Sequence, residues 1–281
     1  MSFISCKIMG GLGNQLFQIF ATISVALSEN KNFIFPFSEM LNVGIPRKTY
    51  WNSLLCELKR FTTWQSNNLI IDSLPRFSER GFEYTELSIK TTNPVCLFGY
   101  FQSYKYFENH YEKIINLINL REKQMEIRNK TDISENTVSM HFRLGDYVSK
   151  QNCHPVMSVK YYINALQHII DKLASDSFRV IYFNEKEDEP TINISIQVLS
   201  RRFPKLEFVK TDLEEDWEQM LSMSICSHNI IANSSFSWWG AYFNENLNKI
   251  VCYPSIWFGP DMKNHNTKDL CPQSWFKIDK N

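Results

Sequence analysis

Apolar and polar positions alternate in blocks along the second half of the chain, where short apolar runs are separated by longer amphipathic stretches. Short, mostly apolar runs are typical of buried strands, and the stretches between them have helical spacing. Five such strands alternating with four helices predict a doubly wound parallel sheet in an α/β protein. The expected strands span 138–142, 178–183, 206–209, 229–232 and 249–253, and the expected helices span 158–173, 192–202, 213–226 and 235–243.

The first half opens with a predicted strand at 3–9, a glycine turn at 10–15 and a strongly apolar helix at 16–27. In this layout, backbone N–H groups and the helix dipole can receive an anion. The spacing is not GxGxxG, and close packing of helix against strand could alone require the glycines. The candidate anion-binding residues of the turn are Gly11, Gly13, Asn14 and Gln15.

An aromatic segment, GYFQSYKYF at 99–107, follows a predicted strand at 95–98. Its rings could stack on a sugar or a base, although a packed aromatic cluster is the more common reason for such a pattern. Tyr100 and Gln102 are the candidates here for lining an acceptor pocket.

The charged stretch at 121–130 indicates a linker or a solvated helix between two halves. With 281 residues the chain is long enough for two domains of ordinary size. We therefore predict an N-terminal α/β domain over 1–130 and a C-terminal Rossmann-like domain over 131–281.

The overall charge argues against a general nucleic-acid surface, because 30 basic side chains balance 30 acidic ones. An anionic ligand must then be held by a local site.

Seven scattered cysteines without a CxxC pair favour a reducing compartment and argue against a zinc site. The longest apolar run is shorter than the roughly 20 residues that span a bilayer. We therefore expect a cytoplasmic protein with at most peripheral membrane contact.

Arg143 directly follows the expected strand at 138–142, and Gly145 and Asp146 indicate a tight turn after it. An arginine at the carboxyl end of a buried strand points into the crevice where α/β proteins bind ligands, and its fork of donors suits phosphate. An Arg–Asp ion pair that holds the turn is the alternative. His141 could donate to a phosphate or fill the core.

A hydroxyl-rich segment, NSSFSWWGA, begins at Asn233 after another expected strand and opens a helix. Its polar side chains can satisfy the first-turn N–H groups or, together with them, hold a pyrophosphate. Trp238 and Trp239 could line the same pocket or belong to the core. The candidate donor-binding residues of this segment are Asn233, Ser234, Ser235 and Ser237.

Other carboxylates carry weaker indications. Asp212 and Glu215 could contact guanine or ribose, but acids at a helix N-terminus are the more common explanation. The acidic stretch at 185–189 is expected to be an exposed loop rather than a cation site. No Asp-x-Asp metal motif occurs in the chain.

Three segments together resemble the α-1,2-fucosyltransferases of glycosyltransferase family 11: GGLGNQLFQ at 10–18, HFRLGDY at 141–147 and NSSFSWWGA at 233–241. GYFQSYKYF at 99–107 is similar to a fourth family segment. The resemblance implies a GT-B-like fold, in which two Rossmann-like domains face each other across a cleft and the second holds the sugar nucleotide. The family usually has a second arginine after the first, where this chain has Leu144.

The same resemblance implies an inverting, metal-independent transfer of L-fucose from GDP-fucose to the 2-hydroxyl of a galactose-containing glycan, without a cofactor, in surface polysaccharide biosynthesis. Arg143, Asp146 and His141 are the candidate catalytic residues, and the general base stays open among several groups. Two alternatives remain: another GDP-deoxyhexose such as colitose, or a catalytically silent protein that binds a GDP-sugar or a glycan.

Overall fold

The computed structural model describes residues 2–42, 45–64 and 69–279, and it divides the chain into two compact units. One unit comprises Met1–Lys123 with His265–Pro272, and the other comprises Gln124–Asn264 with Gln273–Asn281. The division falls inside helix α4 (Leu120–Lys130), several residues before the boundary that we predicted. The return of 265–272 to the first unit was not predicted at all.

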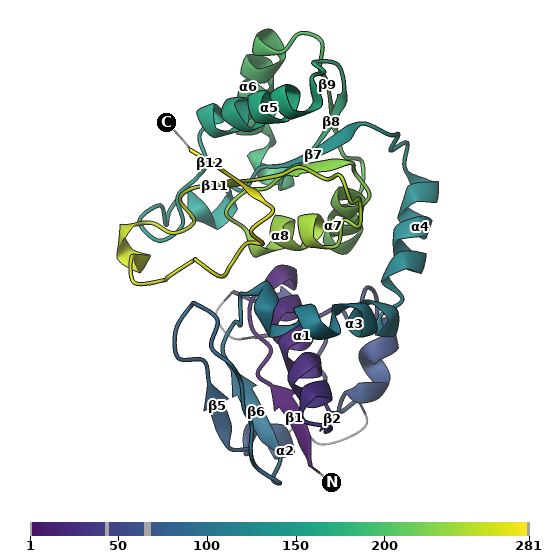
Figure 1. Cartoon of the computed structure of the whole chain (residues 1–281), viewed down its shortest axis with the longest axis vertical. Coiled ribbons are helices and arrows are strands. Elements are labelled where there is room, and N and C mark those ends of the chain that lie inside the picture. Colours follow the sequence, from purple (N-terminus) through teal and green to yellow (C-terminus); the bar gives the residue numbers. More distant parts are fainter. Residues whose placement is uncertain (1, 43–44, 65–68, 280–281) are drawn as a thin grey trace. The chain divides into compact units, whose positions relative to one another are not determined.

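The first unit contains a four-stranded parallel sheet in the order β2-β1-β6-β5, with α1 packed against β1 (Figure 1). Helix α1 is apolar on nearly every side, which is why it is almost entirely buried up to Ala26. A short antiparallel pair, β3 and β4, lies outside this sheet. The elements are β1 (Phe3–Cys6), α1 (Leu12–Ser28), β2 (Asn32–Phe33), β3 (Met40–Leu41), β4 (Arg47–Lys48), α2 (Leu69–Asp72), β5 (Arg76–Ser78), β6 (Val95–Phe98) and α3 (Tyr111–Leu117).

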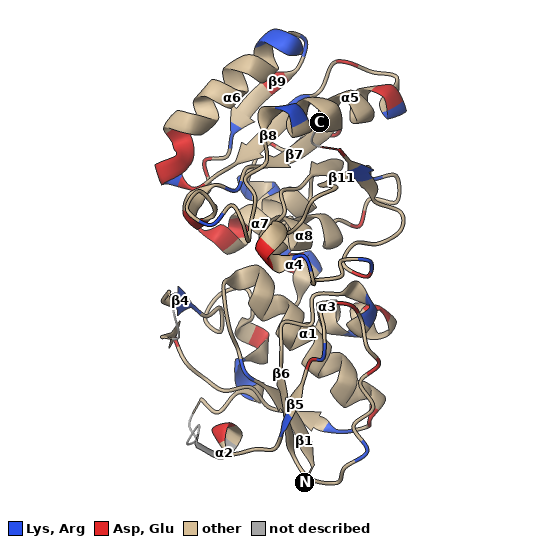
Figure 2. Ribbon diagram, turned by 90° about the vertical axis from the view of Figure 1, so that its left-hand side faces the viewer, with Lys and Arg blue, Asp and Glu red and all other residues tan. Residues whose placement is uncertain are grey.

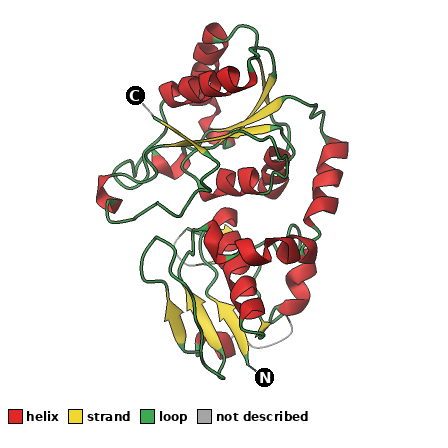
Figure 3. Ribbon diagram, viewed as in Figure 1, coloured by secondary structure: helices red, strands yellow, loops and turns green. Residues whose placement is uncertain are grey.

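The second unit contains a six-stranded sheet in the order β12-β11-β10-β7-β8-β9, in which every pairing is parallel. Helices α5 and α6 cover one face, and α7 and α8 cover the other (Figures 1 and 3). The predicted doubly wound sheet is confirmed, and β12 adds an edge strand that we did not predict. The elements are β7 (Thr137–His141), α5 (Val159–Leu173), β8 (Arg179–Phe183), α6 (Glu189–Arg202), β9 (Glu207–Lys210), α7 (Asp216–Ser224), β10 (His228–Ile230), α8 (Ser235–Tyr242), β11 (Val251–Pro254) and β12 (Phe276–Ile278).

The strand order of this second sheet contains a reversal. From β7 the chain moves outward to β8 and β9, and it then returns to place β10 on the other side of β7. The carboxyl ends of β7 and β10 therefore flank the topological switch point, where open α/β sheets bind their ligands. Arg143 follows β7, and the serine-rich start of α8 follows β10.

Two parallel α/β units in one chain confirm the predicted GT-B-like class with its Rossmann-like halves. The cleft that we expected between the halves stays a prediction. Within the described ranges, no helix combines the length and the apolar character needed to cross a membrane.

Candidate active site at the switch point of the second sheet

The Arg143 side chain lies between carboxylates from two loops. Its Nη2 group donates to Oδ1 of Asp146 at 2.5 Å, and its Nη1 group forms an ion pair with Glu185, which follows β8. The guanidinium also lies over the Tyr147 ring, with 5.0 Å between Cζ and the ring centroid. Burial alone would lower the pKa of Arg143, but Glu185, Tyr147 and Asp146 raise it, so the side chain stays charged.

Gly145 allows the loop after β8 to close on the loop after β7. Its φ of +44° lies in the left-handed region that favours glycine, and a Cβ there would stand 2.6 Å from Oε2 of Glu185. Its N–H donates to Oδ2 of Asp188 at 2.9 Å. The turn that we predicted after Arg143 is therefore present, and Asp188 from a neighbouring loop helps to hold it.

Ser234 caps helix α8, as expected for a serine at this position. Its Oγ accepts the backbone N–H of Phe236 at 3.3 Å, while the Ser237 hydroxyl is buried and donates to the Ser234 carbonyl at 3.5 Å. Asn233 is also buried, and its Nδ2 donates to the carbonyls of Pro155 and Trp257. Asn233 and Ser237 thus shape the start of the helix, and Ser235 is the more exposed hydroxyl.

The arginine loop and the helix start are directly connected. The Tyr147 hydroxyl donates to the carbonyl oxygen of Asn233 at 3.3 Å, and the same Tyr147 ring lies under Arg143. The His141 ring lies 5.4 Å, centroid to centroid, from the Phe236 ring in the first turn of α8. A guanidinium and a helix N-terminus therefore meet at one edge of the sheet, and both attract an anion.

Replacing Ser234 with alanine should lower the free energy of unfolding by about 1 kcal/mol, because the Phe236 N–H loses its acceptor. Urea unfolding followed by circular dichroism measures this loss. Ser234→Asn is the matched control, since asparagine caps helices as well as serine does and should restore most of the stability. Equal losses in both variants would contradict the capping role.

His141 is 7% exposed, and among the described residues its Nδ1 atom has no hydrogen-bond partner. Burial, reinforced by the Arg143 charge, lowers the pKa of His141 to about 3. The imidazole is therefore neutral near pH 7 and is a poor acceptor for a proton. Oδ1 of Asn184 and Oδ1 of Asn233 are likewise buried without a partner in the described part of the chain. All three atoms lie at or just beyond the carboxyl ends of adjacent strands.

Trp238 and Trp239 do not line a pocket in this structure, because both side chains are completely buried. The Trp238 ring stacks on Tyr242 with centroids 4.6 Å apart, and the Trp239 ring packs against Phe243 at 4.8 Å. The structure favours the core interpretation of the two, because these residues belong to the packing that holds α8. A role of either ring in a pocket wall stays a prediction.

The glycine turn of the first unit is held by amide side chains. Gly10 has a φ of +77°, and the buried Gln15 donates from Nε2 to the Gly10 carbonyl at 3.0 Å and to the Lys48 carbonyl at 2.9 Å. Gln102 donates to Oδ1 of Asn14 at 2.8 Å, which connects this turn to the aromatic segment. Gln15 is thus a support for the turn, and the donor-binding role of this segment stays a prediction.

Glu79 supports the same edge of the first sheet, and sequence reasoning missed it. Its Oε2 accepts the backbone N–H groups of Tyr100 at 2.8 Å and Phe101 at 3.1 Å, where Phe101 has a φ of +52°. Burial raises the pKa of Glu79. The turn leaves Tyr100 42% exposed, and its role in an acceptor pocket stays a prediction.

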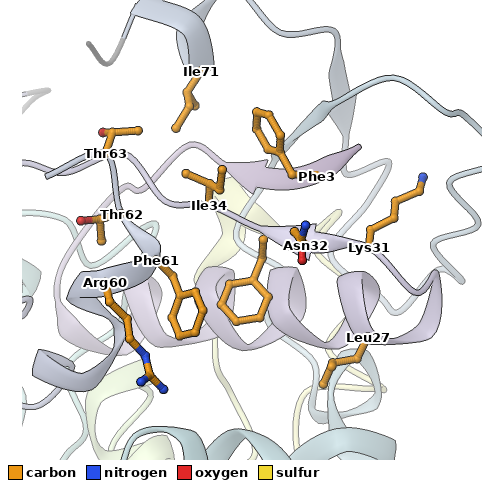
Figure 4. Close-up of a pocket in the computed structure, with 11 residues that line it drawn as sticks. Phe3, Leu27, Lys31, Asn32, Ile34, Arg60, Phe61, Thr62, Thr63 and Ile71 are labelled. Carbon is orange, nitrogen blue, oxygen red and sulfur yellow. The ribbon is translucent and has the colours of Figure 1, made fainter. Parts of the chain in front are cut away.

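A pocket of about 550 Å³ opens at the opposite end of α1 from the glycine turn (Figure 4). Its lining is mainly apolar, and it contains none of the predicted site residues. Thr63 and Ile71 at its edge flank a stretch of chain outside the described residues. The residues that line it are Phe3, Leu27, Lys31, Asn32, Phe33, Ile34, Arg60, Phe61, Thr62, Thr63 and Ile71.

Glu185 and Asp188 are the other residues that sequence reasoning missed, because we assigned their stretch to an exposed acidic loop. Figure 2 shows the acidic start of α6, which follows this loop, and the basic end of the same helix. The sequence did contain a signal for these two acids. Strands of a parallel sheet bring their carboxyl ends to one edge, and this loop follows the strand next to β7.

Glu215 precedes α7 directly, as expected for a helix N-terminal acid. Within the described ranges, no group of three His, Cys, Asp or Glu side chains could hold a metal ion.

Comparisons with known proteins find relatives in sequence and a similar solved structure. The chain is 25% identical to an alpha-1,2-colitosyltransferase of Escherichia coli, over the full length of both chains. It is 30% identical to the Escherichia coli O-antigen biosynthesis glycosyltransferase WbnK over 200 residues, which are 68% of this chain and 63% of that protein. The crystal structure of POFUT1 in complex with GDP matches with a TM-score of 0.49 and 9% identity, over 90% of this chain and 97% of the other.

The protein is a glycosyltransferase. It belongs to Glycosyl transferase family 11, which matches residues 3–278. The family resemblance predicted from the sequence segments is thereby confirmed.

Proposed function

We propose that this enzyme transfers L-fucose from GDP-fucose to the 2-hydroxyl of a galactose-containing glycan, with inversion and without a metal or a cofactor, in the synthesis of a surface polysaccharide. The observation that carries the proposal is the meeting of Arg143 with the capped start of α8 at the switch point of the second sheet. Both features suit the diphosphate of a nucleotide sugar. The name of the WbnK relative, which refers to O-antigen, supports the polysaccharide context.

In this reaction the acceptor oxygen bonds to C1 of the sugar as the bond from C1 to the diphosphate oxygen breaks. GDP departs with the bonding electrons, so negative charge grows on the diphosphate, where Arg143 and the α8 N–H groups stabilise it. The acceptor hydroxyl releases its proton to a base that we leave unassigned. His141 is a weak candidate because of its low pKa, and Asp146 is already paired with Arg143 and lies 3.6 Å from Lys150.

A second candidate function is the transfer of a different GDP-deoxyhexose. It is favoured by the relative that is named a colitosyltransferase and that aligns over the whole chain. The two functions share the diphosphate site and differ only in the sugar, so the geometry around Arg143 supports both.

A silent GDP-sugar-binding or glycan-binding protein is the third alternative, and Leu144 is the residue that motivates it. The cytoplasmic location and the peripheral membrane contact also stay predictions.

Incubation with a panel of galactosides and equal GDP-fucose and GDP-colitose tests the proposal. We expect release of GDP and formation of a fucosylated product in the presence of EDTA. A colitosylated product formed in preference would establish the second candidate. Binding of GDP by calorimetry without transfer to any acceptor would identify a silent protein, and a strict requirement for a divalent cation would contradict the metal-independent mechanism.

A further inference from the structure

The guanidinium that we assign to the donor diphosphate is already occupied by a carboxylate from elsewhere in the chain. Glu185 reaches Arg143 from the loop after β8, and Arg143 is its only hydrogen-bond or ion-pair partner through the side chain within the described residues. The Glu185 side chain is 46% exposed, whereas that of Arg143 is 17% exposed. The arginine is therefore fixed in place, and its partner lies at the surface.

The two carboxylates on Arg143 differ in how firmly they are held. Asp146 is three residues from Arg143 on the same loop, and its other oxygen lies 3.6 Å from Nζ of Lys150. Glu185 belongs to a different loop, and among the residues that the structure describes no second cation pairs with it. Of the two acids, Glu185 is the one that can leave without dismantling the turn that carries the arginine.

Carboxylate and phosphate oxygens compete for the same face of a guanidinium. Both accept two parallel N–H groups from the arginine fork, and both carry negative charge, so they repel each other at contact distance. With Asp146, Glu185 and Asp188 all beside Arg143 or Gly145, an incoming diphosphate meets an acidic loop. Binding then requires that the most loosely held of these acids withdraw.

We propose that Glu185 occupies the phosphate position on Arg143 in the donor-free enzyme and is displaced into solvent when the GDP moiety binds. The inference rests on the proposed function, because it needs a diphosphate ligand at Arg143. Glu185 is then a positioning residue that keeps the guanidinium ordered between turnovers. It lowers the affinity for the donor, since the Arg143–Glu185 contact must break before the diphosphate can bind.

The test compares Glu185→Gln with Glu187→Gln, using GDP as the probe in isothermal titration calorimetry. Glu187 lies in the same exposed loop, and no hydrogen bond or ion pair of its side chain is present in the described structure, so its variant removes an equal charge without touching Arg143. We expect Glu185→Gln to bind GDP about threefold to tenfold more tightly than wild type, with a lower KM for the donor. Glu187→Gln should stay within about twofold of wild type.

Three results would overturn the inference. GDP affinity in Glu185→Gln equal to that of Glu187→Gln would show that the contact does not compete with the diphosphate. Weaker binding would show that Glu185 holds Arg143 in its binding orientation and remains there with GDP bound. These two results leave the proposed function standing, whereas failure of the wild-type enzyme to bind GDP removes both proposals. Glu185→Ala should change the affinity in the same direction as Glu185→Gln, and circular dichroism checks that each variant is folded.

Discussion

Arg143→Ala is expected to lower the turnover number by about 10²–10³, because the variant lacks the fixed positive charge beside the departing diphosphate. The charge at this position is secure in the wild type, since the neighbouring carboxylates raise the pKa of the guanidinium. Arg143→Lys should lose nearly as much, since a lysine keeps the charge but cannot present two parallel N–H groups. The measurement is GDP release under saturating donor and acceptor.

Arg179 provides the matched control for this variant. It begins β8, at the opposite edge of the same sheet, and it also pairs with two carboxylates, those of Asp132 and Glu207. Arg179→Ala removes an arginine with similar partners from the edge of the sheet opposite the proposed site, so turnover should stay within about twofold of wild type. If Arg143→Ala and Arg179→Ala had the same activity, Arg143 would be a structural residue and the mechanism would be wrong.

The architecture of the second unit was predictable because each strand is a short apolar run that alternates with an amphipathic helix. The same reasoning places Arg143 and Ser234 at one edge of the sheet, because the carboxyl ends of parallel strands share an edge. The partners of Arg143 were harder to predict. A run of acids such as Glu185 to Glu189 looks solvated when considered alone, and only the pairing of β7 with β8 places it against the arginine.

Other features depend on contacts between residues far apart in the sequence. The segment 265–272 belongs to the first unit because Asp269 forms an ion pair with Lys105 at 2.5 Å and accepts the Ser103 hydroxyl through its carbonyl at 2.6 Å. No local pattern around Asp269 indicates such partners. Strand β12 is three residues long, so it lacks the periodicity that would have revealed it.

The sequence could not assign the two tryptophans of α8 to the core or to a pocket, and a stability measurement tests that assignment. Helix α8 has eight residues, and several of its faces are apolar, so its pattern does not distinguish a core side from a ligand side. The structure places the Trp238 ring against Tyr242, Trp239 and Trp275, with centroid distances of 4.6, 5.2 and 5.5 Å. Its side chain is 0% exposed. Trp238 therefore contributes to folding rather than to binding.

Trp238→Ala should lower the free energy of unfolding by about 3–5 kcal/mol, because it leaves a cavity among three rings that cannot collapse to fill it. Trp238→Phe is the control: it keeps an aromatic ring in the stack and should lose clearly less, which urea unfolding can resolve. The KM for the acceptor should be unchanged in whichever variant stays folded at the assay temperature. An increased KM with an unchanged unfolding midpoint would instead place this indole in the acceptor pocket, and it would show that the packing around α8 differs in the working enzyme.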